Sequence, residues 1–423
     1  MKFLNKCLSL IFILGLSSCS EKHIKPSSYF TKSLLNKSNN QANINITNDL
    51  FISNSKKFNL SSFKIINHKI LKDTLFFINE KGFLSAFNLD TKKILWSKNT
   101  LNVSFNIHQA GLIINNNKIY ITHDKYLFQL DLNGNLINYT NLLDISFVDP
   151  VIKNDIIYVK TVYNLLALNK FTLETINKAS IKLDANYLFS GDILKLEFLN
   201  NNQLLQGLYN GSIIISDMNL NFIESIYSPP INILNKNQNT NTKFNISGFN
   251  TSPIIFNDKI YIANNIEGLF CINKDGKILN HKKIEDIVQI AASNNIIYIL
   301  SNANQISALS ADNLEVIWNK NLNLYNDNIK NKIPDFEIFS NIIIYQNSLI
   351  FTAEKSKKIY ILNLNGNNFI YQDPNNKIKN ININFNTFKI KENLIELFIY
   401  NNELYSLDNK NLYLLNIYNQ NKK

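Results

Sequence analysis

Arginine is absent from this sequence, so all 43 of its basic side chains other than histidine are lysine. Arginine is the side chain best suited to bidentate contacts with bases and phosphates. The formal net charge of +11 therefore gives poor support for a nucleic-acid partner. Asparagine, isoleucine and lysine are all in excess, which indicates the codon bias of an AT-rich genome and makes the charge a background property.

Cysteine is also scarce, with only Cys7, Cys19 and Cys271 in the chain. Cys7 lies in a predicted signal segment and Cys19 is a predicted acylation site, as argued below. Cys271 is then left without a partner for an internal disulfide. It stands in the apolar stretch 269–272, so we expect a small core residue and not a reactive thiol.

Long hydrophobic runs are missing as well. The apolar run from Cys7 to Leu16 follows Lys2 and Lys6 and is shorter than the ~20 residues of a membrane-spanning helix. It fits the h-region of a cleaved signal peptide. Leu16-Ser17-Ser18-Cys19 comes next and resembles the bacterial lipobox, whose cysteine thiol accepts diacylglycerol. The alternative is an ordinary signal peptide with a chance cysteine.

These features predict three parts of the chain. Residues 1–18 form the lipoprotein signal peptide, and residues 19–48, rich in Ser, Asn and Lys, form a flexible tether from lipidated Cys19. Residues 49–423 form one soluble domain. Ser20, where an Asp would favour inner-membrane retention, favours the outer membrane, so we expect a lipid-anchored protein that faces the periplasm.

An internal repeat predicts the fold of that domain. One phrase, a short apolar strand that often ends in Asn or Asp, recurs with a mean period of about 46 residues. Its eight copies are 84–88, 127–131, 165–169, 213–217, 269–273, 306–310, 359–363 and 404–408.

Each copy has similar neighbours, with a β-rich run such as 118–121 before it and a hairpin pair such as Asn133-Gly134 or Asp275-Gly276 after it. Four short strands per repeat are typical of a propeller blade. The sequence therefore predicts an all-β fold, an eight-bladed β-propeller of four-stranded antiparallel blades. We expect part of segment 44–60 to close the ring by pairing with the blade that contains 404–407. The rival is that 412–415 supplies the last strand and segment 44–60 lies outside.

The first repeat, 82–96, resembles the quinoprotein-type repeat G-x-L-x-A-L-D-x-x-T-G-K-x-x-W, and Ala308 to Trp318 keeps the spacing of Ala86 to Trp96. The resemblance implies that the tryptophan packs between blades. Other copies place Tyr139, Asn280 or aliphatic residues near that point. Two groups share this repeat: quinone-dependent dehydrogenases and BamB-like outer-membrane assembly lipoproteins. The chain is similar to the second group in lipobox, length, blade number and the stretch 250–261.

Catalytic chemistry finds little support. None of the five histidines has metal-ligand spacing with another (His23, His68, His108, His123 and His281). A quinoprotein dehydrogenase holds its cofactor with calcium and commonly has a vicinal disulfide, and the chain has neither a Cys-Cys pair nor an Arg to contact the quinone. We expect no enzyme activity, no metal and no cofactor.

The BamB-like resemblance implies a scaffold that binds the periplasmic domains of the barrel-assembly outer-membrane protein and helps deliver unfolded outer-membrane proteins. Alternatives are a propeller lipoprotein with another envelope partner and a quinone-dependent dehydrogenase. The resemblance places the partner surface on loops that join the third and fourth blades and enter the fifth. The residues it implies are Tyr187, Leu188, Phe189, Ser190, Asp192 and Asn250.

Two of these positions depart from the family pattern. Ser190 stands where the family has Arg, and Asn250 replaces an acidic residue, so the family's ion pairs are replaced here or the partner differs. The apolar residues from Tyr187 to Phe189 suit an interface, where aromatic anchors dominate affinity. The alternative is that they pack into the blade.

Replacing Cys19 by Ala tests the lipobox. Because the thiol is the acyl acceptor, we expect Cys19→Ala to leave an unacylated precursor that keeps its signal peptide and does not reach the outer membrane. Labelling with a radioactive fatty acid and mass measurement of the N-terminus report both steps. Label incorporated into the Cys19→Ala protein contradicts the assignment.

Overall fold

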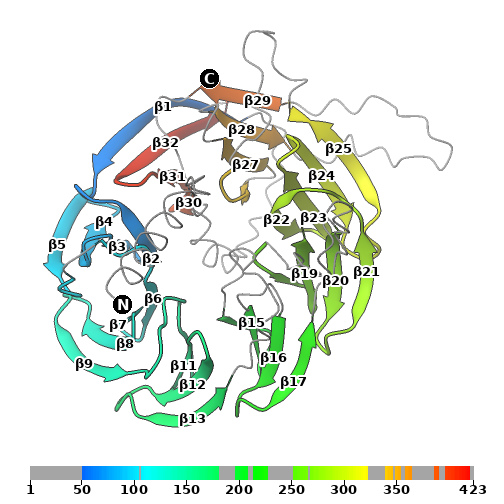
Figure 1. The fold of residues 1–423 in the computed structure, drawn as a ribbon. Coiled ribbons are helices and arrows are strands. Elements are labelled where there is room, and N and C mark those ends of the chain that lie inside the picture. The colour runs from blue at the N-terminus through cyan, green and yellow to red at the C-terminus, as the bar shows by residue number, and fades with distance from the viewer. Residues whose placement is uncertain are drawn as a thin grey trace, which may run out of the picture.

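The computed structural model describes residues 50–103, 106–180, 196–207, 213–226, 251–264, 267–322, 339–345, 348–353, 358–363, 385–389 and 396–419. Its strands form eight four-stranded antiparallel sheets, and Figure 1 shows these sheets arranged as blades around a central axis. The predicted eight-bladed β-propeller is confirmed. No helix in the described ranges has the length and hydrophobicity needed to span a membrane.

The blades follow the chain, and the strands of each are given from the axis outward. Blade 1 contains β2 (Ile65–Leu71), β3 (Thr74–Asn79), β4 (Phe83–Asn88) and β5 (Lys93–Asn99). Blade 2 contains β6 (Gly111–Asn115), β7 (Lys118–His123), β8 (Tyr126–Asp131) and β9 (Leu136–Asn141). Blade 3 contains β10 (Val151–Lys153), β11 (Ile156–Lys160), β12 (Asn164–Asn169) and β13 (Thr175–Ser180). Blade 4 contains β14 (Leu196–Phe198), β15 (Gln203–Gly207), β16 (Ile213–Asp217) and β17 (Phe222–Ile226).

The second half of the ring is built in the same way. Blade 5 contains β18 (Ile254–Phe256), β19 (Lys259–Asn264), β20 (Gly268–Asn273) and β21 (Ile278–Lys282). Blade 6 contains β22 (Ile287–Ser293), β23 (Ile296–Ser301), β24 (Gln305–Ser310) and β25 (Val316–Asn321). Blade 7 contains β26 (Ile343–Tyr345), β27 (Ser348–Ala353), β28 (Lys358–Asn363) and β29 (Phe385–Lys389). Blade 8 contains β30 (Glu396–Tyr400), β31 (Glu403–Leu407), β32 (Asn411–Asn419) and β1 (Leu50–Asn59).

The ring closes by pairing the two ends of the described chain. Strand β1 is the outermost strand of blade 8 and pairs antiparallel with β32, in a register that runs from Leu50 opposite Asn419 to Asn59 opposite Asn411. The expected closure is confirmed. The rival is wrong, because 412–415 does lie in β32 but β1 adds a further strand outside it.

The last repeat needs a correction. In seven blades the repeated phrase forms the third strand from the axis, whereas 404–408 falls on β31, the second strand of blade 8. The physical reason is that second strands and third strands have the same alternation of apolar residues. Tyr405 of β31 takes the place that Tyr120, Tyr158 and Tyr261 take in their own second strands.

Asparagine supplies much of the turn geometry in a chain with only 11 glycines. The turns between first and second strands use Asn116-Asn117, Asn294-Asn295 and Asn401-Asn402, with both residues of each pair at φ between 47° and 62°. Two successive positive φ values are the requirement of tight type I′ hairpins, and Asn tolerates this region better than most residues.

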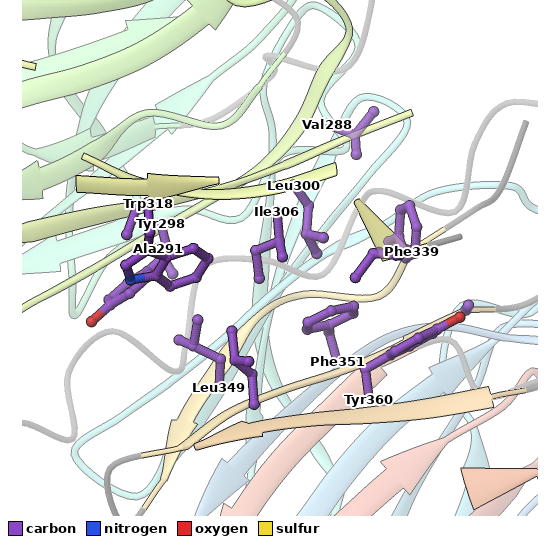
Figure 2. Close-up of a cluster of buried hydrophobic side chains, with 14 residues drawn as sticks. Val288, Ala291, Tyr298, Leu300, Ile306, Trp318, Phe339, Leu349, Phe351 and Tyr360 are labelled. Carbon is purple, nitrogen blue, oxygen red and sulfur yellow. The ribbon is translucent and has the colours of Figure 1, made fainter. Parts of the chain in front are cut away.

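Apolar side chains fill the spaces between neighbouring blades. Figure 2 shows one such cluster, in which Trp318, Tyr298 and Ile306 of blade 6 lie against Leu349 and Phe351 of blade 7. The expected packing of tryptophan between blades is confirmed here. It holds for Trp96 too, because a Cβ added to Gly134 of blade 2 would lie 2.7 Å from the Trp96 ring.

Asparagine replaces tryptophan at this register in three other blades. Asn138, Asn177 and Asn280 each pair with the third strand where Trp96 does in blade 1. Their Nδ2 groups donate to backbone carbonyls of the next blade, 3.2 Å to Thr172, 2.5 Å to Asn219 and 2.9 Å to Asp312. The residue at the tryptophan register of blade 2 is therefore Asn138, one residue before the expected Tyr139.

Second-strand tyrosines make parallel ties. The hydroxyl of Tyr158 donates to the Met218 carbonyl of blade 4 over 3.1 Å, and that of Tyr261 to the Ala311 carbonyl of blade 6 over 2.7 Å. At the closing seam, Lys92 of blade 1 contacts both Tyr405 and Glu403 of blade 8. In each of these ties the tyrosine of one blade reaches the turn between the third and fourth strands of the next.

One buried side chain works against this packing. Lys160, at the end of β11, is almost fully buried. Burial lowers the pKa of its ammonium group from the usual 10.5 to about 7, and the Asp144 carboxylate opposes this shift. Because the unfolded chain keeps the ordinary pKa, it binds the proton more tightly than the folded chain between about pH 7 and 10.5, and stability rises with pH across that window.

Replacing Lys160 by Met tests this cost. We expect Lys160→Met to be more stable than the natural protein at pH 7, because a buried ammonium group no longer has to be desolvated. The advantage should shrink by about 2 kcal/mol between pH 7 and pH 9, where the natural lysine loses its proton in the folded state. Urea unfolding at both pH values measures it, and an advantage that grows with pH refutes the assignment.

Removing strand β1 tests the closure. Deletion of residues 50–59 leaves β32 without its outer neighbour. It also uncovers Leu407 and Leu412, which are buried between blades 8 and 1. We expect the melting temperature to fall by roughly 10 °C or more, because several kcal/mol of packing free energy are lost. Deletion of residues 20–40, which precede the strand, is the control and should leave the melting temperature unchanged. Equal melting temperatures for both deletions speak against closure through β1.

Candidate partner-binding face

All the connections that enter a blade lie at one end of the propeller. Strands alternate in direction, so the segments from a fourth strand to the next first strand share one face with the turns between second and third strands. We call this the upper face. The described segment 142–150, which joins β9 to β10, lies on it. The ends of β13 and β17 and the starts of β14 and β18, which flank residues 181–195 and 227–250, lie at the same face.

The residues predicted from the family resemblance fall on two of these segments. Tyr187, Leu188, Phe189, Ser190 and Asp192 lie in 181–195, and Asn250 lies in 227–250, both outside the described residues. Cys19 is outside them too. Their roles stay predictions, and the described structure bears on them through the residues on either side.

The described residues that flank these two segments are held on the sheets by hydrogen bonds. Ser180, directly before 181–195, pairs with Asn164 of β12. Thr251, directly after Asn250, is buried and its Oγ1 accepts the amide of Ala263 over 2.9 Å.

A similar hydrogen bond between a hydroxyl and the backbone, called a hydroxyl hook below, recurs in two other blades. The Ser340 Oγ accepts the Thr352 amide over 2.9 Å, and the Ser146 Oγ donates to the Lys160 carbonyl over 2.7 Å. Each hook joins the segment that enters a blade to the end of that blade's second strand. The entry points of the upper-face segments are therefore rigidly placed on the sheets.

The described segment 142–150, which enters blade 3, is tied to blades 1 and 2 through Asp149. Its Oδ1 accepts the Asn67 side chain and the Leu112 amide, both over 2.8 Å, and its Oδ2 lies 2.6 Å from the Lys69 ammonium. Gly111 makes room for this approach, since a Cβ there would lie 2.2 Å from the Val148 carbonyl oxygen. Sequence reasoning missed Asp149, although the Asp149-Pro150 pair at a strand entry was a usable signal.

Other polar side chains near the axis serve the innermost strands. Asn341 accepts the Leu397 amide and donates to the Leu397 carbonyl, both over 2.9 Å. His68 lies 3.7 Å from Glu396, but burial, with help from Lys69, lowers the pKa of His68 to about 3. His68 is therefore neutral at physiological pH. Within the described ranges, no group of three or more His, Cys, Asp or Glu side chains is arranged to hold a metal ion.

An apolar strip crosses the upper face between blades 2 and 3. It consists of Tyr126, Leu143, Ile145 and Tyr163. The exposed fractions of Leu143 and Tyr163 are 76% and 59%. Backbone hydrogen bonds connect its parts, from Leu142 to Lys125 over 2.7 Å and from Val162 to Ile145 over 2.9 Å. Exposed apolar groups that lie together are typical of binding surfaces.

The strip leads to the predicted partner segment. Tyr163 directly precedes Asn164, whose partner Ser180 is the last residue before 181–195. The apolar strip therefore lies close to Ser180, the last described residue before the segment that contains Tyr187, Leu188 and Phe189. Sequence reasoning missed the strip, because Tyr126, Leu143 and Tyr163 come from three separate turns.

No family model matches the chain. Two uncharacterized proteins are similar to it in sequence: one from Rickettsia conorii, 27% identical over 293 residues that cover 67% of this chain and 68% of that protein, and one from Rickettsia prowazekii, 26% identical over 278 residues that cover 64% and 65%. The chain thus spans about two thirds of the length of these relatives.

Two solved structures share the architecture. BamB from Moraxella catarrhalis superposes with a TM-score of 0.61 at 15% identity, over 86% of this chain and 99% of that chain. The computationally designed protein Ika8 superposes with a TM-score of 0.60 at 8% identity, over 85% and 98%. At such identities the likeness establishes that the chain has a BamB-like propeller fold.

Proposed function

We propose that this protein is a non-enzymatic scaffold lipoprotein of the outer-membrane β-barrel assembly machinery. Cys19 anchors it in the outer membrane, and the propeller faces the periplasm. Its upper face binds the periplasmic domains of the barrel-assembly protein and helps deliver unfolded outer-membrane proteins to it.

The observation that carries this proposal is an eight-bladed propeller that follows a lipobox. The fold by itself does not decide between roles, because the designed Ika8 superposes as well as BamB does. The lipobox adds an envelope address, and the exposed strip near Ser180 adds a surface suited to a protein partner.

A quinone-dependent dehydrogenase is the alternative from another class. Such an enzyme needs polar side chains around the axis that are free to hold a cofactor. Here Asp149 and Asn341 bind backbone groups of the neighbouring innermost strands, and Asn67 donates to the Ala110 carbonyl over 2.8 Å. This use of the axial polar groups favours a scaffold.

The double variant Leu188→Ala with Phe189→Ala tests the partner face. We expect copurification of the barrel-assembly protein to fall at least about tenfold, because truncated apolar anchors typically cost 1–2 kcal/mol each. Phe222→Ala is the matched control, since Phe222 is 64% exposed but lies on the outer rim of blade 4, and it should copurify normally.

Circular dichroism and the melting temperature separate the two explanations of a loss. A folded double variant that copurifies as the natural protein does argues against this face. A double variant that unfolds supports the packing alternative. Crosslinking followed by mass spectrometry identifies the captured protein, and capture of a different envelope protein in place of the barrel-assembly protein overturns the proposed function.

A further inference from the structure

The outermost strand of each blade has one edge that no other described strand pairs with. Such edges invite pairing with foreign strands, and proteins usually block them with charged residues, especially lysine. Seven of the eight outermost strands contain at least one charged residue. The exception is β9, whose sequence is Leu-Ile-Asn-Tyr-Thr-Asn.

Strand β9 also has three exposed large apolar side chains, whereas β5, β17 and β21 have two each. The exposed fractions of Leu136, Ile137 and Tyr139 are 55%, 50% and 58%. Tyr139 belongs to a group of three rings with Phe128 and Tyr126, whose centroids lie 5.9 to 6.3 Å apart. The uncharged edge therefore has a platform of aromatic rings beside it.

The next blade provides an internal comparison. In β13, Asn177 and Lys178 occupy the registers of Asn138 and Tyr139 in β9. Both asparagines tie their blade to the next one, and the Oδ1 of each accepts the amide of the following residue, 2.9 Å from Tyr139 and 2.8 Å from Lys178. The two edges are thus built alike, and at this register they differ in having an aromatic ring or a charge.

We propose that the edge of β9 binds an extended segment of another polypeptide by strand addition. The incoming segment pairs with the backbone of β9 and places apolar side chains at alternate positions against the rings of Tyr126, Phe128 and Tyr139. It carries no charge on the paired stretch, because the edge offers no countercharge. The Asn138 side chain gives up the Tyr139 amide when the segment binds.

This inference rests on the proposed function in one respect, since it names where the unfolded outer-membrane protein binds. Strands of such proteins alternate apolar and polar residues over about ten residues. That pattern matches the chemistry of the edge. The ring group shares Tyr126 with the apolar strip of the upper face. The two surfaces are nevertheless tested by changes at different residues, Tyr139 for the β9 edge and Leu188 with Phe189 for the barrel-assembly protein.

The probe is a fluorescent peptide of about ten residues, the length of one membrane strand, that alternates valine and threonine. Its binding to the mature full-length protein is followed by fluorescence anisotropy. Tyr139→Lys gives β9 the residue that β13 has at this register, so the fold should tolerate it. We expect its affinity for the peptide to fall at least about tenfold, because a charge now lies at the pairing edge.

Ser97→Lys is the matched control, because Ser97 of β5 occupies the same register in blade 1. This substitution adds the same charge at a place away from β9. It should bind the peptide as the natural protein does. Lys178→Tyr is the reciprocal variant and should raise the number of bound peptides per protein from one toward two. A peptide with proline at its centre cannot complete the pairing and should bind at least about tenfold more weakly.

Three outcomes overturn the inference, in addition to a natural protein that does not bind the peptide. The first is unchanged binding by a folded Tyr139→Lys protein, and the second is equal binding of the proline peptide. The third is a dimer of the natural protein in sedimentation that Tyr139→Lys abolishes, because a second copy then occupies the edge. Copurification of the barrel-assembly protein is measured on the same Tyr139→Lys variant. If the natural protein copurifies that partner and fails to bind the peptide, this inference falls and the proposed function stands.

Discussion

Contact between neighbouring blades is the constraint on which this structure depends. Each blade is a twisted four-stranded sheet with apolar side chains on both faces, so it cannot bury them alone. The buried clusters accordingly draw residues from two blades at once, as with Ile299 and Leu309 of blade 6 beside Tyr261 and Leu269 of blade 5. A ring satisfies every blade in turn, and the pairing of β1 with β32 joins its ends.

The amino-acid composition shapes how those contacts are made. With two tryptophans in the chain, the indole packs between blades only at Trp96 and Trp318. At the same register, Asn138, Asn177 and Asn280 reach the next blade with an amide hydrogen bond in place of a ring. An amide buries less apolar surface than an indole. Tyr158 and Tyr261 compensate in blades 3 and 5, because each combines a large buried ring with a hydroxyl that reaches the adjacent turn.

The sequence was sufficient to predict the blade number and the strands per blade, because both follow from a repeat and from alternating apolar residues. The closing role of the N-terminal segment was predicted from its β-compatible residues before the first repeat. It was misleading at 404–408, where a second strand has the pattern of a third. It gave no access to Asp149 or to the apolar strip. Those depend on side chains such as Lys69 and Tyr163 that are distant in the chain and meet only when blades are stacked. The residues predicted for partner binding and acylation stay predictions, since they rest on a family resemblance and on the lipobox.

The same asparagines connect stability with the exposure of the outer edge. In β9 and β13 the side chain that ties one blade to the next also occupies the amide of the following residue, and so shields part of the edge. In β13 Lys178 adds a charge to that shield, whereas in β9 Tyr139 adds an aromatic surface. An edge protected only by a neutral hydrogen bond is opened at a cost of about 1 kcal/mol, which strand addition can recover through its own backbone hydrogen bonds. An edge that also carries a charge requires the desolvation of that charge as well. Binding at β9 is therefore favoured because β9 lacks the charged residue that the other outermost strands have. The fold itself need not change to permit it.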